Sequence, residues 1–133
     1  EVTQKICKEL EKGEVDFVCL NFANPDMVGH TGILEAVIKA CETVDQSVQK
    51  VVETGLPKGY SFMIIADHGN ADFVMNADGS PNTAHTTNPV PCFLIDSDYK
   101  KIKNGKLGDI APTILKMMGV ATPKEMTGEI LVD

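Results

Sequence analysis

The sequence predicts an α/β domain whose strands are parallel. Two apolar runs rich in β-forming residues, Val15–Phe22 and Phe62–Ala66, predict strands, and the first is expected to be covered on both faces. Between them, apolar side chains recur every three or four residues from Ile33 to Val52, which predicts one long amphipathic helix. A strand, a helix and a strand in this order form a βαβ unit, in which the strands run parallel with a right-handed connection.

Shorter elements flank this unit. The apolar spacing in Val2–Leu10 predicts a helix that ends near Gly13. A further strand is expected over Val90–Ile95. The last helix is predicted over Asp109–Met118, with its first residue as the N-terminal cap and Gly119 as the C-terminal stop.

Length and composition fit one domain. The chain has 133 residues, of which 43% are hydrophobic, and no apolar run is long enough to cross a bilayer. The net charge of −7 argues against a nucleic-acid partner, because binding to a phosphate backbone needs a basic patch. All twelve basic residues are lysines, so this chain has no arginine for a bidentate grip on phosphate.

The four cysteines predict free thiols and a cytoplasmic location. They are too widely spaced for a short metal-binding motif, and each lies within an apolar pattern that predicts burial; they are Cys7, Cys19, Cys41 and Cys92. Buried free thiols are typical of a reducing compartment, and a disulfide framework is the less favoured interpretation.

Three groups of aspartate and histidine predict a metal site. Asp26 and His30 are four residues apart and could share a helical turn, although Pro25 and Gly29 favour a loop that turns both side chains inward. His85 lies near the far end of a long loop, and such loops are usually functional or disordered. Together they offer one carboxylate oxygen and two imidazole nitrogens, which suits Mn²⁺ or Zn²⁺ better than Ca²⁺ and leaves a coordination position open.

Asp67 and His68 predict part of a second site. They follow the predicted strand Phe62–Ala66, at the end where α/β sheets place their ligands. Two cations about 3.5–4 Å apart form the usual clamp for displacement at phosphorus, and the five candidate ligands are enough to complete one site and to begin a second. A turn or helix cap for the aspartates and structural hydrogen bonding for the histidines are the alternatives.

Polar neighbours of these groups are candidates for orienting the ligands, and hydrogen bonding within the loop explains them equally well; they are Asn70, Asp72, Thr86 and Thr87. No serine lies near the predicted ligands in the sequence, and no nucleophile-elbow or phosphate-binding glycine motif is present. The chain therefore predicts metal binding without an obvious attacking group.

Four stretches resemble the cofactor-independent phosphoglycerate mutases: Leu20–Gly32, Ala66–Asp72, Ala84–Pro91 and Asp109–Thr113. The resemblance extends from about Val2 to Leu131. The wider group is that of the alkaline-phosphatase-like metalloenzymes, which share the Asp-His-Gly element but not the long first stretch.

The resemblance implies a three-layer α/β/α fold with a mostly parallel sheet, alkaline phosphatase-like and here incomplete. Residues 1–133 would form the C-terminal part of the phosphatase-like metal-binding domain. The expected partners are the missing N-terminal segment and the transferase domain of the same protein, and the sheet left uncovered predicts self-association.

By the same resemblance, Asp26, His30 and His85 match the ligands of one manganese, and Asp67 and His68 match two ligands of another. The remaining aspartate, the nucleophilic serine and the substrate-binding arginines would lie upstream. The implied reaction moves a phosphoryl group between the 3- and 2-positions of glycerate through phosphoserine, so this chain alone is expected to be inactive. The alternatives are a phosphatase-like or sulfatase-like metallohydrolase fragment and a non-catalytic metal-binding module.

Overall fold

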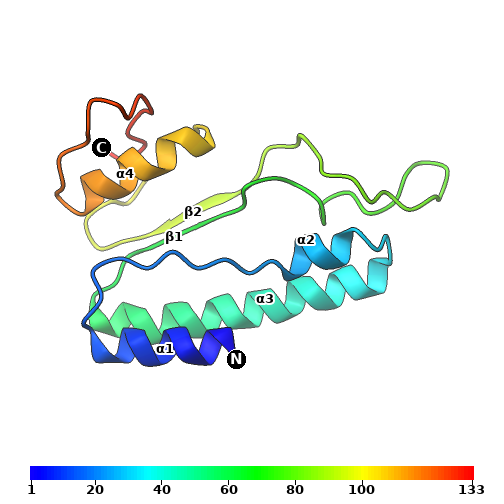
Figure 1. Ribbon diagram of the computed structural model, residues 1–133, viewed down its shortest axis with the longest axis horizontal. Coiled ribbons are helices and arrows are strands. Elements are labelled where there is room, and N and C mark those ends of the chain that lie inside the picture. Colours follow the sequence, from blue (N-terminus) through cyan, green and yellow to red (C-terminus); the bar gives the residue numbers. More distant parts are fainter. The chain divides into compact units, whose positions relative to one another are not determined.

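The computed structural model describes residues 1–133 and divides into two units. The first contains Glu1–Tyr60 and His68–Val90, and the second contains Ser61–Asp67 and Pro91–Asp133. Figure 1 shows the elements of both units along the chain. Helices and strands are both present, so the mixed α/β character expected from the sequence is confirmed.

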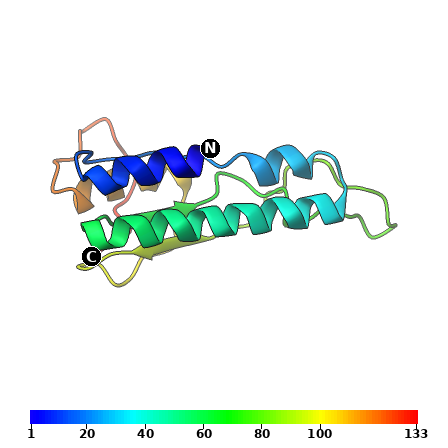
Figure 2. The same ribbon diagram turned by 90° about the horizontal axis from the view of Figure 1, so that it is seen from below.

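Helices dominate the first unit. α1 spans Val2–Lys12, α2 spans Asn24–Gly29 and α3 spans Leu34–Gly55, followed by a 3-10 turn, η1, at Leu56–Lys58. Figure 2 shows α1 lying along α3, and the two helices are in contact. The buried apolar side chains of these helices are Cys7, Leu10, Val37, Ala40 and Val51, which lie on the apolar stripes that predicted both helices.

The strand expected over Val15–Phe22 is absent. No strand is assigned between α1 and α2, and Phe17 is 55% exposed where burial on both faces was expected. The side chain of Tyr60 anchors this stretch by donating a 2.9 Å hydrogen bond to the Val15 carbonyl oxygen. β-Propensity favours an extended backbone, but a strand also needs a neighbouring backbone to pair with. The predicted βαβ unit is therefore not found.

A two-stranded sheet and a helix form the second unit. β1 (Phe62–Ile65) pairs antiparallel with β2 (Cys92–Ile95), with Phe62 opposite Ile95. A 3-10 turn, η2 (Leu107–Asp109), leads into α4 (Ile110–Met117). Both strands lie within predicted ones, but their antiparallel pairing differs from the parallel arrangement that was expected.

Asp109 holds the start of α4, although not as the expected side-chain cap. Its carboxylate accepts 2.9 Å hydrogen bonds from the backbone N–H groups of Lys106 and Glu129, which lie outside the helix. Thr113 is fully buried one turn later; its hydroxyl donates to the Asp109 carbonyl and accepts from the Leu131 N–H. These bonds tie the C-terminal tail to α4. Gly119 follows the helix with φ +69°, as its predicted stop.

The cysteines are free, as expected, but their burial differs from the prediction. Cys7 is buried and Cys92 is half-buried, whereas Cys19 and Cys41 are exposed. Cys19 lies on the segment before α2, which forms no strand, and an apolar sequence pattern alone does not guarantee a covering partner. None of the helices has the length and apolar character needed to cross a membrane.

Candidate metal centre

A single helical turn brings Asp26 and His30 together. The sequence favoured a loop here, but Asn24–Gly29 forms α2, with Pro25 in its first turn and His30 immediately after its end. Proline is accommodated because the first N–H groups of a helix have no partner inside the helix and its φ angle already suits the helix. The i, i+4 spacing places both side chains on the same face.

His85 reaches the same carboxylate from the long loop of the first unit, His68–Val90. Asp26 Oδ1 lies 3.3 Å from His30 Nε2 and 3.0 Å from His85 Nε2. The three candidate ligand atoms all lie within 4.8 Å of one another. Asp26 is half-buried and both histidines are exposed, so the group is open on one side. One oxygen and two ring nitrogens therefore converge at an accessible point.

The orientation of His30 fits a role as a ligand. Its Nδ1 lies 2.7 Å from the Thr83 carbonyl oxygen, which can only accept a hydrogen bond. Nδ1 therefore carries the proton, and in the neutral ring Nε2 has a free lone pair beside Asp26. A ring nitrogen bonded to a backbone carbonyl is the usual arrangement behind a metal-ligating histidine. The donor set and the tautomer both fit a divalent cation.

Asp72 holds the two ends of the loop together. Its carboxylate accepts hydrogen bonds from Asn88 Nδ2 at 2.7 Å and from the Thr86 hydroxyl at 2.9 Å. The Asn88 bond is the largest cause that holds the pKa of Asp72 below its ordinary value, and the Thr86 bond adds to it. The Thr86 N–H also donates to the Gly69 carbonyl at 2.8 Å, in an isolated antiparallel bridge. These contacts fix the backbone next to His85.

The two remaining predicted ligands are adjacent in the chain, and the second of them, His68, begins the same loop. The ring of His68 stacks on that of His85, with centroids 3.8 Å apart and planes 19° apart. Asp67 is exposed and follows β1, in the second unit. The three-residue group contains neither of them, and the assignment of all five residues as ligands stays a prediction.

Two contacts at this site were not foreseen from the sequence. The Thr83 carbonyl carries no sequence signal, because every residue has one. The sequence offered Asn70 as a candidate for orienting a ligand, but it did not indicate that Asn70 approaches Gly29.

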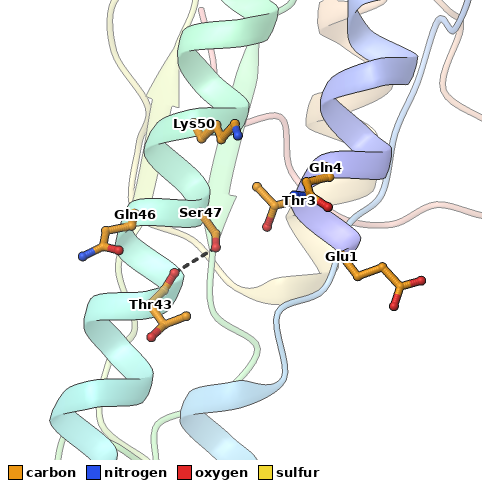
Figure 3. Close-up of a pocket in the computed structure, with 7 residues that line it drawn as sticks. All are labelled: Glu1, Thr3, Gln4, Thr43, Gln46, Ser47 and Lys50. Atoms are coloured by element: carbon orange, nitrogen blue, oxygen red, sulfur yellow. Dashed lines mark hydrogen bonds between the residues drawn. The ribbon is translucent and has the colours of Figure 1, made fainter.

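A hollow on the first unit is lined by residues that differ from those of the candidate metal centre. It has a volume of about 290 Å³ and lies between α1 and α3 (Figure 3). Its lining is mostly amide, hydroxyl and lysine side chains, and it contains none of the candidate ligands; the residues are Glu1, Thr3, Gln4, Thr43, Gln46, Ser47 and Lys50. The Ser47 hydroxyl is already bonded to the Thr43 carbonyl at 2.8 Å. This hollow is separate from the candidate metal centre.

Known proteins that are similar to this chain are named as phosphoglycerate mutases. A 2,3-bisphosphoglycerate-independent phosphoglycerate mutase of Flavobacterium johnsoniae is 61% identical over 127 residues, which cover 96% of this chain and 25% of that protein. The mutase of the same name from Bacteroides thetaiotaomicron is 50% identical over 133 residues, which cover 99% of this chain and 26% of that protein. The chain thus spans about a quarter of the length of these curated relatives.

A solved structure and a family model agree with these relatives. A crystal structure of Leishmania mexicana phosphoglycerate mutase at low cobalt concentration matches with a TM-score of 0.86 and 28% identity, covering 99% of this chain and 27% of that one. The resemblance to cofactor-independent phosphoglycerate mutases that the sequence motifs indicated is confirmed. The model of the metalloenzyme superfamily matches residues 1–122, and the chain therefore belongs to that superfamily.

Proposed function

We propose that this chain supplies the metal-binding part of a cofactor-independent phosphoglycerate mutase. The reaction is the interconversion of 3-phosphoglycerate and 2-phosphoglycerate, in glycolysis and gluconeogenesis. The observation that carries the proposal is the convergence of Asp26, His30 and His85 on one point, in a chain similar to mutases over its length. The nucleophilic serine of the proposed phosphoserine intermediate lies in a part of the mutase outside residues 1–133.

The proposal includes two divalent cations, with Mn²⁺ first and Zn²⁺ as the alternative. Asp26, His30 and His85 would hold one ion, because a carboxylate oxygen and two imidazole nitrogens suit either metal. Asp67 and His68 would contribute to the other, together with groups outside the chain. When bound, such ions supply positive charge and Lewis acidity for phosphoryl oxygens.

The residues of the chain then have positioning tasks. The Thr83 carbonyl fixes the His30 ring, and the stack of His68 on His85 limits rotation of both rings. Asp72 holds the loop that carries them. With its ligands oriented in advance, the centre loses less entropy when a cation binds.

The wider context belongs to the same proposal. Residues 1–133 form the C-terminal part of an alkaline-phosphatase-like domain, a three-layer α/β/α fold with a mostly parallel sheet. The similarity of 99% of the chain to one part of the Leishmania mutase supports this placement. A cytoplasmic location fits the four free thiols, which are typical of reducing compartments. Self-association of the chain stays a prediction.

The test uses the full-length protein that contains this chain. ³¹P NMR follows the conversion of 3-phosphoglycerate to 2-phosphoglycerate without 2,3-bisphosphoglycerate, before and after the protein is stripped of metal and resupplied with Mn²⁺. We expect metal-dependent conversion that His85→Ala abolishes and that Lys8→Ala, an exposed change on α1, leaves intact.

Other outcomes would assign other functions. Release of inorganic phosphate without isomerisation would indicate a phosphatase-like hydrolase, and metal binding without turnover would indicate a non-catalytic module. The 133-residue chain alone, supplied with Mn²⁺, is expected to show no more turnover than its His85→Ala variant.

A further inference from the structure

Asn70 touches the same oxygen on which the two histidines converge. Its side-chain Nδ2 donates a 3.1 Å hydrogen bond to Asp26 Oδ1. An ionised carboxylate can only accept, so the amide must present its nitrogen to Asp26 and its oxygen to the opposite side. Asn70 is only 6% exposed, so its amide lies away from solvent.

Gly29 makes room for the other end of that amide. A Cβ atom built on Gly29 would lie 1.8 Å from Asn70 Oδ1 and 2.7 Å from its Cγ. Gly29 is the last residue of α2 and is not among the glycines with positive φ, so its backbone would accept alanine. The need for glycine at this position is therefore steric, and its cause is the Asn70 side chain.

These contacts connect two motifs that the chain separates widely. α2 carries Asp26 and Gly29, and Asn70 follows His68 by two residues. Without the amide, the Asp26 carboxylate could rotate about its side-chain torsions, and Oδ1 would face the two Nε2 atoms only part of the time. A hydrogen bond to a ligand oxygen restricts that rotation before a cation arrives.

We propose that Asn70 is a positioning residue that orients the Asp26 carboxylate for cation binding, and that Gly29 is required because it admits the Asn70 side chain. The inference rests on the metal centre proposed above and adds to it two residues that do not themselves bind the ion. It implies that the α2 turn and the Asn70 loop form one preorganised support for the first cation.

A double-mutant cycle tests the inference in the full-length protein that contains this chain. The variants are Asn70→Ala, Gly29→Ala and the double variant, and Mn²⁺ affinity is measured by calorimetry and by the EPR signal of free Mn²⁺. We expect each single change to weaken binding at the Asp26 centre by about 10–100-fold, as is typical when a ligand's supporting partner is lost. In the double variant Gly29→Ala should add less than about twofold, because the truncated Asn70 leaves space for the new methyl group.

Two controls separate positioning from a general loss of structure. Gly108→Ala introduces a Cβ with no atom within 4 Å, and Asn76→Ala removes amide bonds to Ser80 and Pro81 within a local turn. Both should keep the Mn²⁺ affinity of the unchanged protein, and thermal unfolding of all variants without metal reports folding. If Asn70→Ala and Gly29→Ala lower the unfolding temperature but leave Mn²⁺ affinity within about twofold, far below the typical loss, their role is structural and the inference is overturned.

The cycle also distinguishes this inference from the proposed function. Fully additive single effects would show that the Gly29 and Asn70 contact is not what supports Asp26, and would overturn the inference alone. If the unchanged protein and its His85→Ala variant bind Mn²⁺ equally, the centre itself is wrong and both proposals are lost.

Discussion

The Thr83 carbonyl oxygen accepts a 2.7 Å hydrogen bond from Nδ1 of His30. Thr83 precedes His85 by two residues, so the segment that carries one imidazole also sets the tautomer of the other. Both Nε2 atoms then point at Asp26 Oδ1. The loop therefore contacts α2 and the residue after it through both histidines as well as through the hydrogen bond from Asn70 to Asp26.

Removing His30 should reduce Mn²⁺ affinity more than removing a supporting residue does. His30→Ala deletes a proposed ligand, so we expect a loss beyond the roughly 100-fold upper range for supporting partners. Thr83→Ala is the matched control, because it keeps the backbone carbonyl that accepts the bond from His30. Calorimetric titration of both variants checks this. A similar affinity for His30→Ala and Thr83→Ala would contradict the assigned ligand.

Gly32 is expected to tolerate alanine less well than Gly119. Both have positive φ, +64° and +69°, so alanine brings a backbone strain of about 1–2 kcal/mol at either position. At Gly32 the new Cβ would also lie 2.3 Å from Cβ of Pro81, whereas Gly119 has open space. Urea unfolding of the two variants measures the difference, which reports the Pro81 contact. Equal losses of stability in the two variants would mean that the loop carrying Pro81 moves away from the new methyl group without cost.

Thr113→Val should destabilise the fold by about 1–3 kcal/mol, because it leaves the buried Leu131 N–H without its acceptor. Valine keeps the shape of threonine, so the loss reports the hydroxyl and not a cavity. Thr43→Val is the control, since the Thr43 hydroxyl makes a similar bond to a helix carbonyl on the exposed face of α3. Its free energy of unfolding should change by less than about 0.5 kcal/mol. Comparable changes in urea unfolding for the two variants would show that the tail does not depend on Thr113.

Acid should weaken the C-terminal part of the fold through Asp109. The N–H groups of Lys106 and Glu129 hold the pKa of Asp109 below its ordinary value of 3.8. Because the folded pKa is the lower one, the ionised carboxylate stabilises the fold above the unfolded pKa, and this contribution is lost as pH falls through the folded pKa. We expect the urea concentration at the unfolding midpoint to decrease when the pH is lowered under about 4. Asp109→Asn should make the midpoint depend less steeply on pH. The test is to measure urea midpoints from about pH 3 to 6 in Asp109→Asn and in the exposed control Asp45→Asn. Identical slopes of midpoint against pH in the two variants would exclude Asp109 as the cause of the acid sensitivity.

Helices could be predicted because their signal is local. The stripe from Ile33 to Val52 anticipated α3, Leu34–Gly55, and Gly119 was correctly expected to end α4. The segment Val15–Phe22 shows where local reasoning ends, because its residues favour extension but a ladder depends on a distant backbone. The antiparallel partner of β1 was missed for the same reason.

The candidate site also has features that the sequence predicted and features that it did not. Residue chemistry identified Asp26, His30 and His85 as a group, and the structure brings these three together. The α2 turn was not expected, since Pro25 and Gly29 were read as loop residues, yet the first accommodates a helix start and the second receives Asn70. Which backbone carbonyl fixes a ring, and which glycine admits a side chain, depends on tertiary packing that the local sequence does not contain.

The loop from His68 to Val90 is held by isolated bridges at Gly69 and Met75 and by the Asp72 carboxylate, with no continuous strand of its own. Such segments open locally at little free-energy cost and are preferred sites for proteases. Under the proposed ligation, a cation shared by His85 and the α2 residues would act as a crosslink that closes this segment. Scarcity of metal would then leave this segment, whose turn at Asp78 is already exposed, open more often to cleavage, so that the supply of the ion would govern how long the protein survives as well as whether it works.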